Sequence, residues 1–291
     1  MSSSHLALFS LQGKIAAVTG GTRGIGKAMA IALAEAGADV ALLQRDLSNT
    51  EVRDEIRALG RKCEVLQLDI AEPESCAKAI PAVIEAMGDL DILVNNAGIQ
   101  KRHKAVDFPD EDFDLVMQCN LKSVWTLSQA AGRHMVKKGS GKIISTASLL
   151  SFQGGLTVPA YAAAKGGVAN ITKALSNEWA SQGVNINAIA PGYIATDMNT
   201  ALLQDDTRRR QIIERIPQGR FGNADDFKGA VVYLASNASN YVNGEVLVVD
   251  GGWMGKSISF CSERVIGYDR LTNQIFDVFK RPLNSGSRYA N

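Results

Sequence analysis

The sequence predicts a single α/β domain in which a parallel, seven-stranded sheet is covered by helices on both faces. Short apolar segments of β-prone residues alternate with longer helical segments along most of the 291 residues. A glycine-rich turn joins the first apolar segment to the first helical one, and no internal repeat or linker interrupts the alternation. Such alternation is typical of a doubly wound fold with right-handed crossovers.

Seven strands and six helices are expected from the hydrophobic pattern. The expected strands are the short apolar segments at 14–19, 39–44, 63–68, 91–94, 142–147, 184–190 and 245–249. The expected helices lie near 24–36, 51–59, 73–87, 111–137, 160–181 and 224–236. Gly60 follows the second helix and Pro73 stands near the start of the third, where these residues are common.

The composition is that of a soluble globular protein. Hydrophobic residues make up 46% of the chain and charged residues 21%, and one α/β domain of about 250 residues is ordinary. A net charge of +1 gives no reason to expect nucleic acid or an acidic membrane surface as a partner. No apolar run approaches the roughly 18 residues of a membrane span, and the first residues lack the basic region of a signal peptide. We therefore expect a cytoplasmic protein.

Cysteine and histidine positions indicate neither a disulfide framework nor a metal site. Cys63, Cys76, Cys119 and Cys261 form no C-x-x-C pair, and the three histidines form no H-E-x-x-H motif. A reducing compartment and chemistry without a metal are the expectation.

The turn after the first strand is suited to a phosphate group. Gly20, Gly24 and Gly26 lie between that strand and the first helix. Glycines at such a turn let the backbone approach a pyrophosphate, whose charge is stabilised at the helix N-terminus. The spacing is not the G-x-G-x-x-G motif, so a purely structural turn remains an alternative.

Two later strands end in residues suited to ligand binding. The strand near 91–94 runs into Asn95-Asn96-Ala97-Gly98, and the strand near 184–190 runs into Pro191-Gly192 with Thr196 beyond. Ligands bind at the carboxyl ends of strands in open α/β sheets. An ordinary turn is the alternative at both places.

A possible proton-transfer group follows the fifth expected strand. Tyr161 and Lys165 stand four residues apart on an expected helix, where they share one face, and Ser148 precedes the tyrosine by thirteen residues. A neighbouring ammonium favours the ionised phenol, and the serine could hold a carbonyl or alcohol oxygen against it. Read alone, the Tyr-x-x-x-Lys pair is more often a solvated helix face.

Together these motifs resemble the short-chain dehydrogenase/reductase family. The matching elements, in family order, are Thr19-Gly20-x3-Gly24-Ile25-Gly26, Asp69, Asn95-Asn96-Ala97-Gly98, Asn120, Ser148, Tyr161-x3-Lys165 and Pro191-Gly192. The resemblance runs from about Leu11 to Gly255 and implies a single Rossmann-type dinucleotide-binding oxidoreductase domain there. It leaves residues 1–10 as an N-terminal extension.

The resemblance also implies roles for four residues. Tyr161 is the expected general acid in reduction and base in oxidation, with its pKa lowered by Lys165 and by the cationic ring of the cofactor. Lys165 is expected to bind the nicotinamide ribose and Ser148 the reacting oxygen. Asn120 is expected to hold a water that links Lys165 to solvent.

A nicotinamide cofactor is implied, and NADP is expected in preference to NAD. NAD-preferring members carry an acidic residue at the position of Gln44, whereas Arg45 and Arg23 here offer guanidinium groups to a 2′-phosphate. Binding of the ribose by Asp46 is the alternative. The expected cofactor-binding residues are Gly20, Thr22, Arg23, Gly24, Ile25, Gly26, Arg45, Asp69, Ile70, Asn95, Asn96, Ala97, Gly98, Tyr161, Lys165, Pro191, Gly192, Ile194 and Thr196.

The sequence around the motifs resembles the branch of the family that acts on keto-deoxy sugar acids. These are 2-dehydro-3-deoxy-D-gluconate 5-dehydrogenases and 2-deoxy-D-gluconate 3-dehydrogenases. Besides Ser148 and Tyr161, Gln153 is expected to bind sugar hydroxyls, and Arg102, ahead of Lys101, the carboxylate. Residues 101–104 could equally be an exposed basic loop.

Other readings remain open at this point. The protein could reduce a polyol, a 3-oxoacyl group or a secondary metabolite, or it could be a non-catalytic scaffold. The resemblance implies a homotetramer or homodimer formed through the helices near 111–137 and 160–181 and the C-terminal segment. Residues 256–291 extend beyond the family pattern as a tail, which could be disordered, a surface helix or an error of translation in silico.

Overall fold

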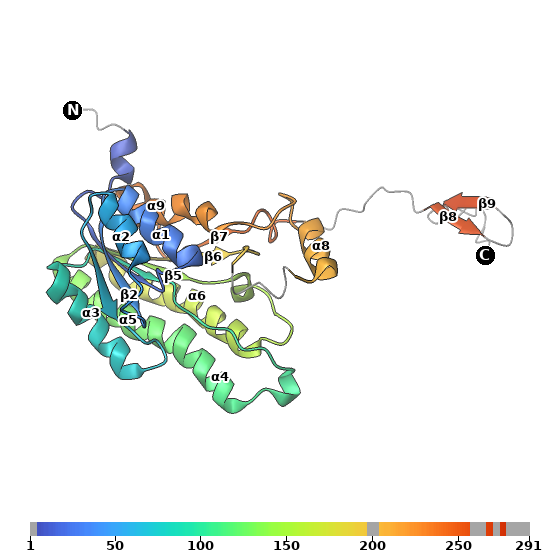
Figure 1. Cartoon of the computed structure of the whole chain (residues 1–291), viewed down its shortest axis with the longest axis horizontal. Helices are drawn as coiled ribbons and strands as arrows, with labels where there is room; N and C mark the ends of the chain where they lie inside the picture. Colours follow the sequence, from blue (N-terminus) through green and yellow to red (C-terminus); the bar gives the residue numbers. More distant parts are fainter. Residues whose placement is uncertain (1–4, 197–203, 257–265, 270–273, 278–291) are drawn as a thin grey trace, which may run out of the picture. The chain divides into compact units, whose positions relative to one another are not determined.

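Figure 1 shows a computed structural model of the chain, which describes residues 5–196, 204–256, 266–269 and 274–277. The chain divides into two compact units, Met1–Gly255 and Lys256–Asn291, and each is described by itself.

The larger unit is built on a seven-stranded sheet in the order β3-β2-β1-β4-β5-β6-β7, and all its neighbouring strands are parallel. Its strands are β1 (Ile15–Thr19), β2 (Asp39–Gln44), β3 (Cys63–Gln67), β4 (Ile92–Asn95), β5 (Gly141–Thr146), β6 (Val184–Pro191) and β7 (Val246–Val249). The predicted parallel sheet is confirmed. The strand order reverses direction between β1 and β4, and ligands of such sheets bind at the carboxyl ends beside that point.

The sheet is sandwiched between helices. These are α1 (Gly24–Glu35), α2 (Glu51–Ala58), α3 (Pro73–Met87), α4 (Asp110–Met117), α5 (Ser123–Lys138), α6 (Pro159–Trp179), α8 (Asp206–Arg215) and α9 (Lys228–Ala235). In Figure 1, α1 and α9 lie on one face of the sheet, while α3, α5 and α6 lie on the other. Alternation along each strand follows from this: in β2, Leu42 belongs to the core beneath α1 and α9, and Leu43 to the core beneath α3 and α5.

Two expected helices are divided in the structure. The helix expected at 111–137 is α4 and α5 joined by a π-helical turn, Gln118–Lys122. The one expected at 224–236 begins as a 3-10 turn, Ala224–Phe227, before α9. Helix α8 was not expected as a separate element. The remaining 3-10 turns are His5–Phe9, Ala105–Asp107, Leu149–Ser151, Ala180–Gln182 and Asn237–Ser239.

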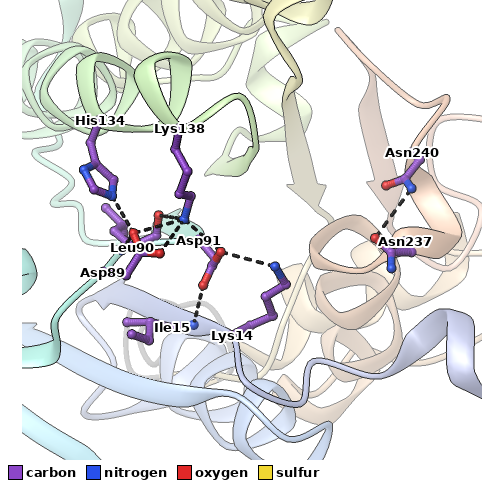
Figure 2. Close-up of polar contacts among 9 residues, drawn as sticks. All are labelled: Lys14, Ile15, Asp89, Leu90, Asp91, His134, Lys138, Asn237 and Asn240. Atoms are coloured by element: carbon purple, nitrogen blue, oxygen red, sulfur yellow. Dashed lines mark hydrogen bonds and ion pairs between the residues drawn. The ribbon is translucent and has the colours of Figure 1, made fainter.

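The amino-terminal edge of the sheet carries a network of paired charges (Figure 2). Lys138 on α5 donates to both carboxylate oxygens of Asp89 and to Asp91. Asp91 also accepts from Lys14 and from the backbone of Ile15. These bonds tie the starts of β1 and β4 to the end of α5.

The smaller unit contains an antiparallel pair of strands, β8 (Ile266–Asp269) and β9 (Gln274–Asp277), in which Gly267 pairs with Phe276. The residues of the tail that the structure describes within these ranges are therefore strands and not a helix.

No helix in the described part of the chain has the length and apolarity needed to cross a membrane. The same residues contain no group of three side chains that could hold a metal ion.

Candidate active site

The glycine turn between β1 and α1 lies at the carboxyl-terminal edge of the sheet. Gly20 and Gly24 have φ values of 65° and 53°, a backbone region that favours glycine. A Cβ atom at Gly26 would overlap the carbonyl oxygen of Gly20. The turn is thus a bare backbone cradle at the N-terminus of α1, as a pyrophosphate site requires. Of the other predicted residues here, Thr22 and Ile25 are half-buried and Arg23 is exposed.

The end of β4 packs against this turn. Thr19 Oγ1 accepts from the backbone N–H groups of Asn96 and Ala97, both at 2.9 Å. The amide of Asn96 donates to the carbonyl oxygens of Thr19 and Gly20. The side chain of Asn95, the last residue of β4, is buried. These bonds fix the distance between the glycine turn and β4.

Asn95 donates into the core instead. Its amide lies 3.0 Å from Ser128 Oγ on α5 and 3.4 Å from Ser145 Oγ on β5. The side chain therefore joins β4 to α5 and to the neighbouring strand β5.

Asn120 lies on the π-helical turn between α4 and α5 and is fully buried. Its Oδ1 accepts from the backbone N–H of Ile99 at 2.8 Å, and its Nδ2 donates to the Ile99 carbonyl at 2.7 Å. A Cβ at Gly98 would press on Asn120 Oδ1. π-turns of this kind are frequent at functional sites, and this one holds the loop that follows β4.

Ser148, Tyr161 and Lys165 meet at the end of β5, as predicted from their spacing. Ser148 caps the turn Leu149–Ser151, and its hydroxyl is hydrogen-bonded to the phenol of Tyr161. Lys165 is 3% exposed, and its Nζ donates to the carbonyl of Thr146 at 2.5 Å. That nitrogen lies 5.7 Å from the centroid of the Tyr161 ring.

Burial controls the electrostatics of this group. Burial lowers the pKa of Lys165 from 10.5 to about 8. Burial also raises the pKa of Tyr161, while the hydrogen bond with Ser148 and the charge of Arg102 oppose that shift. The lowering expected for the pKa of Tyr161 depends on Lys165 together with the cationic ring of the cofactor; in the protein alone, the loss of hydration outweighs the contacts with Ser148 and Arg102.

The other predicted cofactor residues line the same edge. The carboxylate of Asp69 accepts from the backbone N–H of Ala71, and the carbonyl of Ile70 accepts from Gln118. Gly192 approaches Asp250 so closely that a Cβ would not fit. Beyond Pro191, Ile194 is buried, and Thr196 lies 3.5 Å from the position of a Cβ at Gly24.

The end of β2 bears on the choice of cofactor. Gln44 is 6% exposed, and its amide nitrogen donates to the carbonyls of Asp46 and Asn49. The Asp46 carboxylate accepts from both the backbone and the hydroxyl of Ser48, which holds its pKa below the usual range. Arg45 between them is exposed. Asp46 is thus engaged within its own turn, and the arginine is the group presented at this strand end.

The two basic residues predicted to bind a carboxylate, Arg102 and Lys101, are held by different partners. The guanidinium of Arg102 is exposed, donates to Gln100 at 2.7 Å, and by its charge acts to lower the pKa of Tyr161. Lys101 pairs with Asp112 at 2.9 Å. Gln153 is half-buried in the loop between Ser148 and Tyr161. Asp112 was not singled out from the sequence, because its contacts with the loop are made across nine or more positions and leave no local pattern.

Comparison with known proteins identifies the class. The family described as Enoyl-(Acyl carrier protein) reductase matches residues 20–254. A 2-dehydro-3-deoxy-D-gluconate 5-dehydrogenase of Pseudoalteromonas atlantica is 52% identical over 253 residues, 86% of this chain and 100% of that protein. The chain belongs to the short-chain dehydrogenase/reductase family and is an oxidoreductase.

Solved structures agree with this assignment. A protein of Agrobacterium tumefaciens assigned as a 2-deoxy-D-gluconate 3-dehydrogenase, with bound NADP, has a TM-score of 0.81 and 47% identity over 86% of this chain and 99% of its own. A gluconate 5-dehydrogenase of Burkholderia cenocepacia in complex with NADP and tartrate has a TM-score of 0.84 and 39% identity over 87% of this chain and 100% of its own.

Proposed function

We propose that this protein is an NADP(H)-dependent dehydrogenase that interconverts a secondary alcohol and a ketone on a keto or keto-deoxy sugar acid. The observation that carries the proposal is the meeting of Ser148, Tyr161 and Lys165 at the end of β5, where the charge of Arg102 also acts to lower the pKa of Tyr161. A carboxylate on the substrate could pair with this guanidinium while an oxygen further along the same carbon chain lies at Tyr161 and Ser148. The names of several relatives, which are dehydrogenases of gluconate or of a gluconate derivative, support the same substrate class.

The cofactor fits the residues present. The glycine turn is a cradle that side chains would fill, and the N-terminus of α1 points its amides there. Asp69, Asn96, Gly192 and Thr196 lie along the same edge and would hold the remainder. When bound, the nicotinamide supplies or accepts the hydride.

Proton transfer falls to this chain's own residues. Tyr161 donates its phenolic proton to the ketone oxygen in reduction and accepts it from the alcohol in oxidation, while the Ser148 hydroxyl holds that oxygen in place. With a pKa of about 8, Lys165 can gain or lose a proton near neutral pH and so restore the proton on the phenol.

Asn120 would complete the proton path through its backbone. Its side-chain amide is engaged at both ends by Ile99, so a water linking Lys165 to solvent would have to bind the backbone carbonyl of the π-turn. The side chain then serves to hold that turn in place.

NADP is favoured over NAD by the groups at the end of β2. Gln44 carries no negative charge to repel a 2′-phosphate, and Asp46, the alternative partner for the ribose, is bonded to Ser48. Arg45 is exposed beside them. A neutral residue and an exposed guanidinium suit a phosphate better than a pair of free hydroxyls.

An oligomer, a homotetramer or homodimer, is part of the same proposal. A shallow apolar hollow of about 470 Å³ opens between α4, α5 and α6, lined in part by Met117, Leu121, Trp125 and Ile171. Exposed apolar surface of this kind is what a second copy would cover. Analytical ultracentrifugation would test it, and a monomer at micromolar concentration would reject it. We also infer a cytoplasmic location, consistent with the buried free thiols of Cys63, Cys76 and Cys119.

Steady-state kinetics on paired substrates tests the proposed activity. D-Gluconate and D-sorbitol differ only in a carboxylate against a hydroxymethyl group, and 2-dehydro-3-deoxy-D-gluconate and a 3-oxoacyl thioester extend the panel. We expect the highest kcat/KM with a sugar acid and NADP(H). Equal activity on the acid and the neutral polyol, or a preference for the thioester, would reject the substrate class.

A further inference from the structure

A short segment, residues 100–104, carries Arg102 and is fastened to the rest of the protein by the residues on either side of that arginine. Lys101 and His103 both contact Asp112. Arg102, between them, donates instead to Gln100 at 2.7 Å. The direction of Arg102 thus follows from where its two neighbours are held.

Asp112 holds both neighbours with one carboxylate. Its Oδ1 lies 2.9 Å from Lys101 Nζ, and its Oδ2 accepts from His103 Nε2 at 2.7 Å. These contacts keep the pKa of Asp112 below its usual range, Lys101 contributing most, so the carboxylate is charged at neutral pH. The side chain lies in the first turn of α4 and is itself only partly exposed.

The other side of the segment is fixed to the loop that precedes Tyr161. The backbone N–H of His103 donates to the carbonyl of Thr157 at 3.1 Å. Thr157 has a φ of 64°, a conformation in which a β-branched residue is strained, and among the described residues it alone other than glycine has a positive φ. Strain of this kind persists where the surroundings over-determine the backbone. The His103 ring also packs edge-on against Phe108 at 5.0 Å.

We propose that Asp112 is a positioning residue for substrate specificity: by holding Lys101 and His103, it aims Arg102 at the carboxylate of an acidic substrate. Asp112 touches neither the reacting oxygen nor Tyr161 and acts only through the segment. The inference rests on the proposed function, because it takes Arg102 to be the carboxylate-binding group. Beyond the proposed function, the inference assigns to Asp112 the selectivity of Arg102 for charged over neutral substrates.

Substitution of Asp112 by asparagine tests this directly. Asp112→Asn keeps the shape of the side chain and removes its charge, so both contacts weaken and Arg102 samples other directions. We expect KM for D-gluconate to rise about tenfold with kcat nearly unchanged, and KM for D-sorbitol to stay the same. Glu111→Gln is the matched control, since Glu111 is an exposed carboxylate in the same helical turn, and it should change neither constant.

The double variant separates positioning from a general effect on the fold. If Asp112 acts through Arg102, then Asp112→Asn should have little further effect on KM for the acid once Arg102→Gln is present. Additive effects, or equal rises in KM for the acid and the polyol, would overturn the inference. So would an unchanged KM in Asp112→Asn while Arg102→Gln raises it, which leaves the proposed function standing. An unchanged KM in Arg102→Gln would instead reject the carboxylate site itself, and the inference with it.

Discussion

Two buried lysines at the two ends of strand β5 differ in what surrounds them. Lys142 is the second residue of the strand and is 9% exposed. Lys165 on α6 is 3% exposed and contacts Thr146, the last residue of the strand. Burial lowers the pKa of both from 10.5 to about 8. Both side chains are buried, and their pKa values alone do not distinguish them.

Their neighbours separate them. Lys142 donates to the amide oxygens of Asn185 and Asn240, which fastens β5 and β6 to the loop after α9. Lys142 lines a cavity of about 620 Å³ together with Asn237 and Tyr241. The charged side chains of the network in Figure 2 pair with one another and not with Lys142. Lys165 lies instead 5.7 Å from the ring of Tyr161. A lowered lysine pKa therefore indicates burial. A catalytic role is indicated only when the lysine also lies beside a side chain that can donate or accept a proton.

The largest difference in activity is expected between two variants that each lose one phenolic hydroxyl, one at the carboxyl-terminal edge of the sheet near Lys165 and one at the amino-terminal edge near Lys142. Tyr161→Phe keeps the ring and removes the proton donor, so turnover should fall about 10²- to 10⁴-fold while NADPH still binds. Tyr241→Phe makes the same change at the amino-terminal edge, where the tyrosine is fully exposed, and should leave kcat unchanged. Near-normal kcat in Tyr161→Phe would show that another group transfers the proton.

The same comparison can be made with the lysines themselves. Lys165→Met removes a charged donor beside Tyr161, and hydrogen bonds to charged groups are worth about 1.5–3 kcal/mol, so kcat/KM should fall roughly 10- to 100-fold. Lys142→Met should leave kcat/KM within about twofold of the native enzyme, since that side chain reaches only amides of the scaffold. Steady-state assays of both variants at pH 7 provide the measurement. Similar losses of kcat/KM in the two variants would contradict a catalytic role that is specific to Lys165.

A smaller effect is expected from Arg45 at the carboxyl end of β2. Arg45→Asp replaces an exposed cation with an anion beside the neutral Gln44, which should disfavour a 2′-phosphate and favour ribose hydroxyls. We expect the ratio of kcat/KM for NADP to that for NAD to fall at least about tenfold. Arg53→Asp, a change of the same size on α2, serves as the control. A native enzyme that already prefers NAD would contradict the assignment.

Local patterns were sufficient to predict the sheet and the placing of Tyr161 beside Lys165. A strand buried on both faces is a run of apolar residues, and a helix of Pro159–Trp179 puts Tyr161 and Lys165 on one face wherever it lies. The glycine turn could also be predicted from the sequence, because a position such as Gly26 has no room for a Cβ atom and must be glycine.

Contacts between distant segments could not be predicted in the same way. The bonds of Asp112 to Lys101 and His103 depend on where α4 comes to lie against an extended loop. The inward direction of Asn95 depends on serines 33 and 50 positions away. The π-turn at Gln118–Lys122 preserves an apolar pattern that also suits one continuous helix.

Both lysines should contribute in the same way to the pH dependence of the free energy of unfolding, although only Lys165 is expected to contribute to activity. In each, the folded state loses its proton near pH 8 and the unfolded state near pH 10.5, so between these values the unfolded chain binds more protons. The free energy of unfolding therefore rises with pH through this window, by at most about 3 kcal/mol for each lysine. Denaturant unfolding at pH 7.5 and 9.5 should show a smaller rise in Lys142→Met, and in Lys165→Met, than in the native protein. An undiminished rise in either variant would mean that the lysine keeps an ordinary pKa in the fold.

The smallest effect is expected from removing the tail, residues 257–291. The compact unit that carries both lysines and the whole candidate site ends at Gly255, and the family match ends at residue 254. A chain that stops at Lys256 should therefore express, bind NADPH and turn over as the full chain does, and its oligomeric state should be the same. Size-exclusion chromatography and kcat/KM of the two chains side by side provide the measurement. Loss of the oligomer or aggregation of the shorter chain would assign β8 and β9 a structural role in the assembly, because two short strands have too little apolar surface to be stable alone.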